Sequence, residues 1–130
     1  MIGVDTSVLV RYLVGDDLQQ SQLAQNVFNA LSTYEPGFIS REVMIETVWV
    51  LERAYKISRP HIGSVIEGLL AAEELKIEQS GDIAWVLRRY LENKSGFADL
   101  MIACAGQRKG CTVTVTFDKG AAGIEGMNLL

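Results

Sequence analysis

The apolar positions of the chain alternate between short runs, which predict strands, and three- and four-residue spacings, which predict helices. The runs predict strands at residues 1–4, 38–39, 75–79, 111–117 and 127–130. The spacings predict helices that start after Asp5, near Leu18, at Ser40, Ser58 and Ser80, and at Phe97. The last five of these helices are expected to end near residues 33, 56, 72, 94 and 109. We expect 1–4 to be a buried strand, 75–79 an edge strand, and 111–117, which is rich in Thr and Val, a central strand.

Strands that alternate with helices are joined by crossover connections, which place parallel strands in one sheet with helices on both faces. The sequence therefore predicts an α/β fold. Its 130 residues, 48% of them hydrophobic, are enough for one domain with its own core. In open sheets of this kind, ligands bind beyond the carboxyl ends of the strands. Side chains that follow strands are therefore the first candidates for function.

Four carboxylates lie in apolar segments, close to the expected ends of strands or within the helices: Asp5, Glu46, Asp99 and Asp118. An ionised side chain in such surroundings is costly unless a partner pairs with it. If the four acids converge, their oxygens suit a hard divalent cation such as Mg²⁺ or Mn²⁺. The pattern therefore predicts a metal-dependent phosphodiesterase. Neighbouring hydroxyls are secondary candidates for the same site: Thr6, Ser7 and Thr116.

Each acid also has a local explanation that needs no metal. Asp5 can cap a helix, Asp99 can be an anion favoured by the first turn of a helix, and Asp118 can be a turn residue. Glu46 can lie on a solvated helix face. Unlike Glu42, however, it lies one turn inward among apolar residues and is not a first-turn acid. The shared site explains all four acids at once, which favours it.

The net charge and the types of residue present argue against several other kinds of chemistry. With 12 basic and 16 acidic residues, the formal charge of −4 gives no overall attraction to a polyanion, so nucleic acid must be held locally. The candidates for this role are basic residues near the acidic segments: Arg11, Arg41, Arg53, Lys94 and Lys119. His61 is the only histidine and lies far from the acids in the sequence. Zinc hydrolysis and a Ser-His-Asp triad therefore have little support.

The two cysteines, Cys104 and Cys111, are seven residues apart and form no Cys-x-x-Cys motif. Asp5 interrupts any apolar run at the start of the chain, so we expect no secretory signal. No run approaches the roughly 20 apolar residues that a membrane-spanning helix needs. We therefore expect reduced thiols, a cytoplasmic location and no membrane span.

Four segments of the chain resemble, in order, the motifs of the PIN-domain ribonucleases, and specifically of the VapC-like toxins of bacterial and archaeal toxin-antitoxin modules. The segments are VDTSVLVRYLVGDD, ISREVMIETVWVLERAY, SGFADLMIACA and VTFDKGAAGIEGMNLL. The resemblance implies a three-layer α/β/α sandwich around a mainly parallel sheet of four to five strands, formed as a single domain by residues 1–130. It also implies RNA cleavage that depends on Mg²⁺ or Mn²⁺, a cognate antitoxin protein as inhibitor, and a homodimer. Carried over by position, the acidic site consists of Asp5, Glu46, Asp99 and Asp118.

One position departs from the motifs. Some members of the family carry a further acid three residues before the third-motif aspartate, where this chain has Gly96. The resemblance therefore does not imply a strict two-metal mechanism.

Two other classes of function remain open. Asp5 followed by Thr6 is similar to the opening of a Mg²⁺-dependent phosphoryl-aspartate phosphatase or receiver, although Ser7 replaces the second acid of such a phosphatase. The other class is a non-catalytic interaction module, whose carboxylates cap helices and whose apolar helices bind a partner. Metal-dependent RNA cleavage that a chelator abolishes would separate the nuclease from both.

Overall fold

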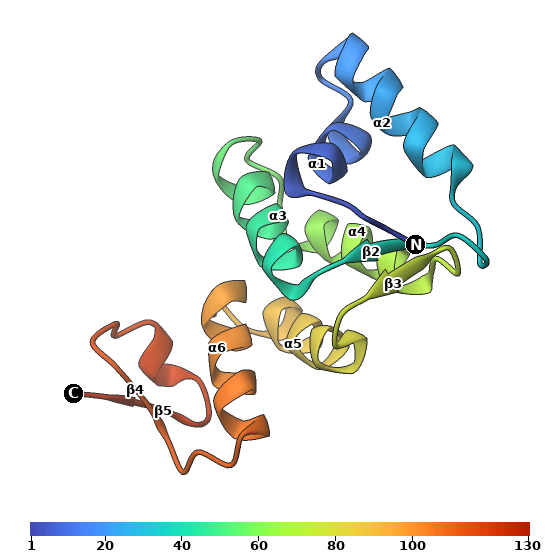
Figure 1. Cartoon of the computed structure of the whole chain (residues 1–130). Helices are drawn as coiled ribbons and strands as arrows, with labels where there is room; N and C mark the ends of the chain where they lie inside the picture. Colours follow the sequence, from blue (N-terminus) through green and yellow to red (C-terminus); the bar gives the residue numbers. More distant parts are fainter. The chain divides into compact units, whose positions relative to one another are not determined.

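Helices and short strands alternate along the chain in the computed structural model, which describes residues 1–130 (Figure 1). Met1–Ser80 and Gly81–Leu130 form two compact units. The first unit contains β1 (Ile2–Gly3), α1 (Thr6–Val14), α2 (Leu18–Ala30), β2 (Gly37–Ile39), α3 (Arg41–Arg53), α4 (Arg59–Ala71) and β3 (Leu75–Ile77). The second contains α5 (Ser80–Glu92, which starts at the boundary residue), α6 (Phe97–Arg108), β4 (Thr114–Thr116), the 3₁₀ helix η1 (Ala121–Gly123) and β5 (Met127–Leu129).

The sheet of the first unit has the strand order β1-β2-β3, and both pairs are parallel. Ile2 lies opposite Gly37, and Gly37 lies opposite Leu75. Position 37 favours glycine, because a Cβ there would lie 2.8 Å from Cδ1 of Leu31. Helices connect the strands, as parallel pairing requires (Figure 1).

Apolar side chains from the helices and β2 are buried in the first unit. The fully buried ones include Leu9, Ile39, Met44, Leu51, Ile62 and Ile66. α1 packs on α2, where the rings of Tyr12 and Phe28 stack with their centroids 3.9 Å apart. Nη1 of Arg11 donates to Asp16 and to the Tyr55 hydroxyl, which itself donates to Asp16. This network ties the end of α1 to the segment that follows α3.

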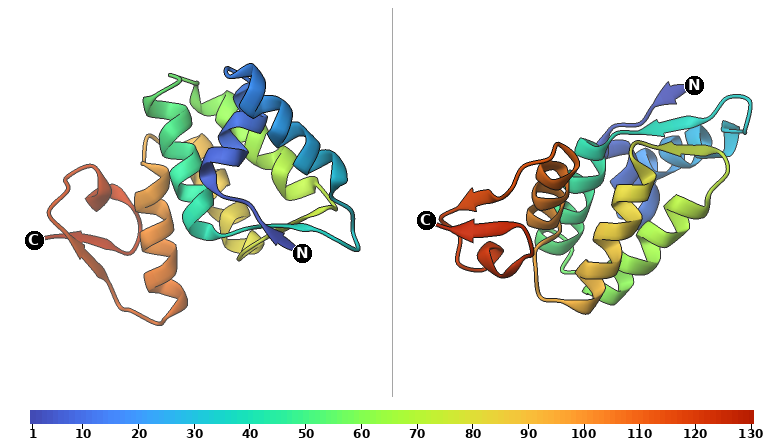
Figure 2. Two further views of the ribbon diagram at one scale, coloured as in Figure 1. Left: turned by 45° about the horizontal axis from the view of Figure 1, so that its top comes forward. Right: turned by 90° about the horizontal axis from the view of Figure 1, so that it is seen from below.

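In the second unit, β4 and β5 form a parallel pair with Thr114 opposite Met127. In both views of Figure 2, these strands (red) lie beside α6 (orange). Gly106 of α6 allows this approach, because a Cβ there would lie 2.5 Å from Oγ1 of Thr114. The buried rings of Tyr90 in α5 and Phe97 in α6 meet edge to face, with centroids 5.6 Å apart. These contacts fix α6 against both the strand pair and α5.

The predicted helices are confirmed, with ends that differ by a few residues. α3 and α4 start at Ser40 and Ser58 as expected, and both serines cap their helices, since their hydroxyls accept from the backbone N–H groups of Val43 and His61. All five strands pair in parallel, which confirms the α/β fold class, and they form one sheet of three strands and one of two. β3 is an edge strand, as predicted.

Two predictions about strands are wrong. Residues 1–4 are expected to form a buried strand, but both residues of β1 are exposed, and only Val4 after it is buried. The strand expected to be central at 111–117 is β4, which pairs only with β5 and leaves Val115 and Phe117 exposed. A run of Val and Thr identifies an extended segment. Because its alternate side chains point to opposite faces, the run does not by itself decide burial or position within a sheet.

Candidate functional site

Asp5 links β1 to α1 in the first unit and caps the helix. Its Oδ2 accepts hydrogen bonds from the backbone N–H of Ser7 (3.3 Å) and from the Ser7 hydroxyl (2.8 Å). These bonds, led by the one from the hydroxyl, hold the pKa of the exposed Asp5 carboxyl below its ordinary value. The local explanation of Asp5 as a helix cap is therefore confirmed. The same bonds keep the carboxylate ionised, as a cation ligand must be.

Glu46 lies in the middle of α3, and its side chain is exposed. This exposure agrees with the local explanation of a solvated helix face, not with an enclosed carboxylate. Val43 and Val50, three residues before and four residues after Glu46, lie on the same side of α3, but both are only half-buried. The buried side of α3 is formed by Met44, Thr47, Val48 and Leu51. Glu42, in the first turn, is also exposed, so the two glutamates differ in their position along α3 rather than in burial class.

Asp99 lies half-buried in the first turn of α6, in the second unit. The N-cap of α6 is Gly96, and no side chain caps this helix, so Asp99 is not a cap. Its place in the first turn agrees with its local explanation as an anion favoured there. Burial and, after it, the negative charge of Asp118 raise the pKa of the Asp99 carboxyl above its ordinary value. The structure therefore brings Asp99 and Asp118 close enough to repel each other.

Gly96, at the position that departs from the motifs, also bears on Asp99. A Cβ on Gly96 would lie 3.1 Å from Oδ2 of Asp99. A side chain at position 96 would therefore press on this carboxylate unless the carboxylate moved. Gly96 leaves room beside the one half-buried carboxylate among the four candidates.

Asp118 follows β4 and is exposed. Its Oδ1 accepts hydrogen bonds from the backbone N–H groups of Gly120 (2.7 Å) and Ala121 (3.2 Å). Its own N–H donates to Oγ1 of Thr116 (3.0 Å), so that hydroxyl takes part in the turn. Asp118 is therefore the turn residue that its local explanation predicts. Both bonds to its side chain use the same oxygen, and they fix the orientation of the carboxylate.

These acids can bind one metal ion only if their carboxylates lie close together. Within neither unit do three or more His, Cys, Asp or Glu side chains come together as a metal site. Asp99 and Asp118 are brought together in the second unit. Asp5 caps α1 and Glu46 lies on α3, two helices of the first unit that pack against each other. The convergence of all four on one ion stays a prediction.

The donor atoms of the second unit's pair fit a divalent cation. Carboxylates are the hard oxygen ligands that Mg²⁺ and Mn²⁺ prefer. Burial and, after it, repulsion by Asp118 raise the pKa of Asp99, and a cation between the two carboxylates would offset the repulsion. The residues present are therefore compatible with the predicted metal.

The basic residues predicted to hold nucleic acid fall into two groups. Arg11 pairs with Asp16 at 3.0 Å, and Arg41 donates to Gln79 at 2.9 Å, so both are engaged within the first unit. The exposed members of the set are Arg53, Lys94 and Lys119.

Sequence reasoning missed two arginine contacts in the second unit. Arg108 pairs with the buried Asp82, and the Arg89 guanidinium lies over the ring of Trp85, 3.4 Å from its centroid. Trp85 and Arg89 are four residues apart on α5, and this spacing is a signal that could identify their contact. The Asp82–Arg108 pair joins two helices and has no such local signal.

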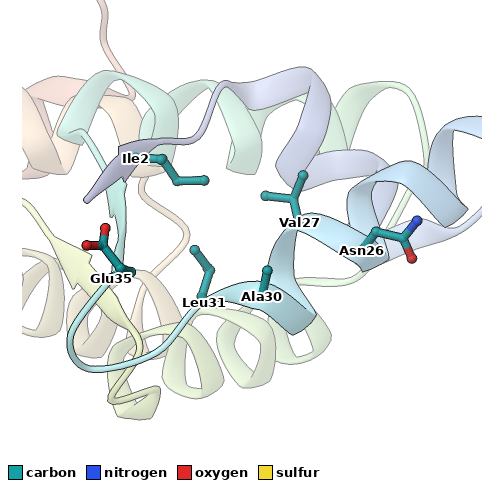
Figure 3. Close-up of a pocket in the computed structure, with 6 residues that line it drawn as sticks. All are labelled: Ile2, Asn26, Val27, Ala30, Leu31 and Glu35. Carbon is teal, nitrogen blue, oxygen red and sulfur yellow. The ribbon is translucent and has the colours of Figure 1, made fainter.

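Figure 3 shows an apolar cavity of the first unit with a volume of about 450 Å³. Its lining consists of Ile2, Asn26, Val27, Ala30, Leu31 and Glu35. Glu35 pairs with the N-terminal amine of Met1 at 2.9 Å. Because Glu35 is the one ionisable side chain in the lining, this cavity is not the candidate active site.

None of the helices combines the length and the apolar character that a membrane crossing requires, as predicted. Neither Cys104 nor Cys111 forms a disulfide.

The family model of the PIN domain matches residues 2–126, a range that includes all four acids and reaches into both units. The chain belongs to the PIN-domain family. It is also similar to the VapC ribonuclease of Aquifex aeolicus (strain VF5), with 29% identity over 117 residues, which are 89% of this chain and 86% of that protein. The predicted resemblance to VapC-like PIN domains is therefore confirmed.

Proposed function

We propose that this protein is a metal-dependent endoribonuclease that acts as the toxin of a toxin-antitoxin module. The PIN-domain match and the similarity to a VapC ribonuclease support this function over a phosphoryl-aspartate protein. The observation that carries the proposal is the Asp99–Asp118 pair. Two carboxylates are held close together there, at a cost that a cation can relieve.

In this proposal, Asp5, Glu46, Asp99 and Asp118 are the catalytic acids and the ligands of one Mg²⁺ or Mn²⁺ ion, within a single PIN domain of residues 1–130. When bound, the ion supplies an acidified water for attack on phosphorus and neutralises charge on the phosphate oxygens. Asp5 contributes a carboxylate that its low pKa keeps ionised, and Asp118 contributes one that its turn orients. A cation would favour the ionised form of Asp99, whose pKa is raised in its absence.

The proposed substrate is RNA. The proposed protein partners are a cognate antitoxin and a second copy of the chain, and the proposed location is the cytoplasm. These partners follow from the VapC-like resemblance. The absence of a helix that could span a membrane agrees with this assignment.

The enzymatic part is tested by RNA cleavage. The purified protein should cut a single-stranded RNA that carries a fluorophore and a quencher when Mg²⁺ or Mn²⁺ is present, and EDTA should stop the reaction. Glu46→Gln should remove cleavage and leave the fold intact. Glu42→Gln, one turn earlier on the same helix and also exposed, should keep most of the activity. Equal losses in both variants would show that the wrong glutamate is assigned, and cleavage that persists in EDTA would contradict the metal dependence.

The toxin role is tested separately in cells. Expression of the chain alone should arrest growth, and co-expression of the product of an adjacent reading frame should relieve the arrest. Glu46→Gln is the matched control, because it should be harmless and still bind the antitoxin. A harmless parent chain with full ribonuclease activity in vitro would indicate a housekeeping nuclease. A chain that binds a partner but never cuts RNA would indicate an interaction module.

A further inference from the structure

Two cavities of the second unit share the side chain of Trp85 in their linings. The first, of about 260 Å³, is lined by Trp85, Cys104, Gln107 and Arg108. The second, of about 250 Å³, has a lining that includes Trp85, Arg89, Asn93 and Glu125. Trp85 is only partly buried. A partly exposed aromatic ring therefore borders two cavities whose linings are rich in polar side chains.

The ring of Trp85 is held in a defined position. The guanidinium carbon of Arg89 lies 3.4 Å from the ring centroid, and Nη1 of Arg89 donates to the Trp85 carbonyl oxygen at 3.3 Å. This cation–π contact restricts both side chains before any ligand arrives. Sites for single-stranded nucleic acid combine aromatic rings on which bases stack with cations that meet the backbone. Trp85 and Arg89 supply both parts.

Arg108 adds a second positioned cation. Its Nε and Nη2 both approach Oδ1 of Asp82. The Asp82 side chain is 11% exposed, whereas the Arg108 side chain is 64% exposed. A largely buried carboxylate thus orients a guanidinium that faces solvent. Guanidinium groups oriented in this way suit phosphate oxygens, which they can meet with two parallel hydrogen bonds.

The charge distribution favours the second unit for contact with a polyanion. Residues 81–130 contain six Lys and Arg against five Asp and Glu, whereas residues 1–80 contain six against eleven. RNA is therefore repelled less by the second unit than by the first.

Trp49, the other tryptophan, lies in the first unit on α3 and is 58% exposed. It has Glu46 and Glu52 within three residues and is in the lining of neither cavity. The two tryptophans therefore differ in charge and surroundings, which makes Trp49 a matched control for Trp85.

We propose that Trp85, Arg89 and Arg108 form a binding site for single-stranded RNA. A base stacks on the face of the Trp85 ring that Arg89 does not cover, and the adjoining phosphates meet the two guanidinium groups. The inference rests on the proposed RNA substrate, and it adds a substrate contact outside the four acids. The site holds the RNA strand and takes no part in the bond cleavage itself.

The test measures binding of a short oligouridine to the full chain in EDTA, so that cleavage does not interfere. In Trp49→Phe the one indole is Trp85, and in Trp85→Phe it is Trp49. The oligouridine should quench the fluorescence of Trp49→Phe in a saturable way and leave that of Trp85→Phe nearly unchanged. In anisotropy measurements with a labelled oligouridine, Trp85→Ala should weaken binding by about tenfold, whereas Trp49→Ala should not. Thermal melting shows whether each variant is folded.

The arginines are tested in the same assay. Arg89→Gln and Arg108→Gln should weaken binding and make it less sensitive to salt, because each removes a phosphate contact. Arg88→Gln, an exposed neighbour on α5, is the control and should change little.

Other outcomes overturn the inference. Quenching of Trp49 but not of Trp85 would place the RNA in the first unit. Equal quenching of Trp85 by a polyglutamate peptide would show a site for acidic polymers in general. If Trp85 does not respond while the parent protein still cuts RNA, the Trp85 site is wrong and the ribonuclease proposal stands. Saturable quenching of Trp85 in Trp49→Phe, together with a parent protein that never cuts RNA, would support the site and contradict the ribonuclease.

Discussion

The pKa of Asp99 is raised by burial and by the negative charge of Asp118, so the folded chain binds a proton at Asp99 more tightly than the unfolded chain does. Well below the ordinary pKa of 3.8, Asp99 is protonated in both states. As the pH rises through 3.8 and then through the raised pKa of the folded state, the fold loses stability at this site. At neutral pH the metal-free fold therefore carries a local penalty that a cation can offset.

Asp99→Asn removes this penalty while nearly preserving the shape of the side chain. In EDTA at pH 7 the variant should melt at a higher temperature than the parent, and the difference should shrink as the pH is lowered toward 4. The variant should also lose most of the stabilisation by Mg²⁺ or Mn²⁺. For the parent this is about 2.7 kcal/mol at a hundredfold excess over the dissociation constant. Melting curves with chelator and with metal measure both effects.

Glu92→Gln is the control for this experiment, because Glu92 is an exposed acid at the end of α5 in the same unit. It should leave the metal response unchanged. If the metal shift of Asp99→Asn equals that of the parent, Asp99 is not a ligand.

Ser7 lowers the pKa of Asp5, whereas burial and Asp118 raise the pKa of Asp99. The Ser7 hydroxyl is the largest cause of the lowered pKa of Asp5. Ser7→Ala should therefore raise the pKa of Asp5 toward its ordinary value, and only in part, because the backbone N–H of residue 7 still donates. Carboxyl chemical shifts followed by NMR from pH 2 to 6 measure this change. Ser21→Ala is the control, since the Ser21 hydroxyl donates to a backbone carbonyl; an equal shift of Asp5 in both variants would contradict the assignment.

The lowered pKa of Asp5 also sets the sign of a stability effect. A carboxyl group with a depressed pKa stabilises the fold above its unfolded pKa, and this contribution is lost as the pH falls through the folded pKa. Ser7→Ala should therefore reduce stability at neutral pH and make little difference in strong acid.

The helices could be predicted because their signals are local. The hydroxyls of Ser40 and Ser58 bond to N–H groups three residues later, and these contacts depend on nothing distant in the chain. The positions of β1 and β4 within their sheets depend on which segments lie alongside, and residues 1–4 and 111–117 do not contain that information. The extended conformation of both segments was therefore predicted correctly, whereas the burial expected for residues 1–4 and the central position expected for 111–117 were not.

In the candidate site, too, features set by local contacts could be predicted, whereas burial could not. Asp5 and Asp118 could be placed at the ends of strands from the sequence, and so could their roles as cap and turn residue. The exposure of Glu46 could not be decided, because Val43 and Val50 suggest one apolar stripe on α3 and Met44 with Leu51 another. Only packing against neighbouring elements decides between two such stripes.

The Tyr55 hydroxyl lies at the centre of the hydrogen-bond network at the end of α1. It accepts from Arg11 at 3.0 Å and donates to Asp16 at 2.8 Å. Tyr55→Phe breaks both bonds and should lower the free energy of unfolding by about 1 kcal/mol, measured by urea denaturation. Tyr34→Phe is the control, because Tyr34 is 93% exposed and should change little. Equal effects of the two substitutions would show that the network does not stabilise the fold.

The hydroxyl of Thr47 is buried without a partner. The residue is 2% exposed on the buried side of α3, and Oγ1 makes no hydrogen bond. An unsatisfied buried hydroxyl costs about 1–3 kcal/mol, and valine replaces it with a methyl group of similar shape. Thr47→Val should therefore raise the free energy of unfolding by about 1 kcal/mol, whereas Thr112→Val, at an exposed position, should change it by less than about 0.5 kcal/mol. A loss of stability in Thr47→Val would show that the hydroxyl has a partner.

Because Thr47 follows Glu46 directly, RNA cleavage should be measured in the same variant. A more stable protein that no longer cuts RNA would mean that the hydroxyl serves the acidic site rather than the fold.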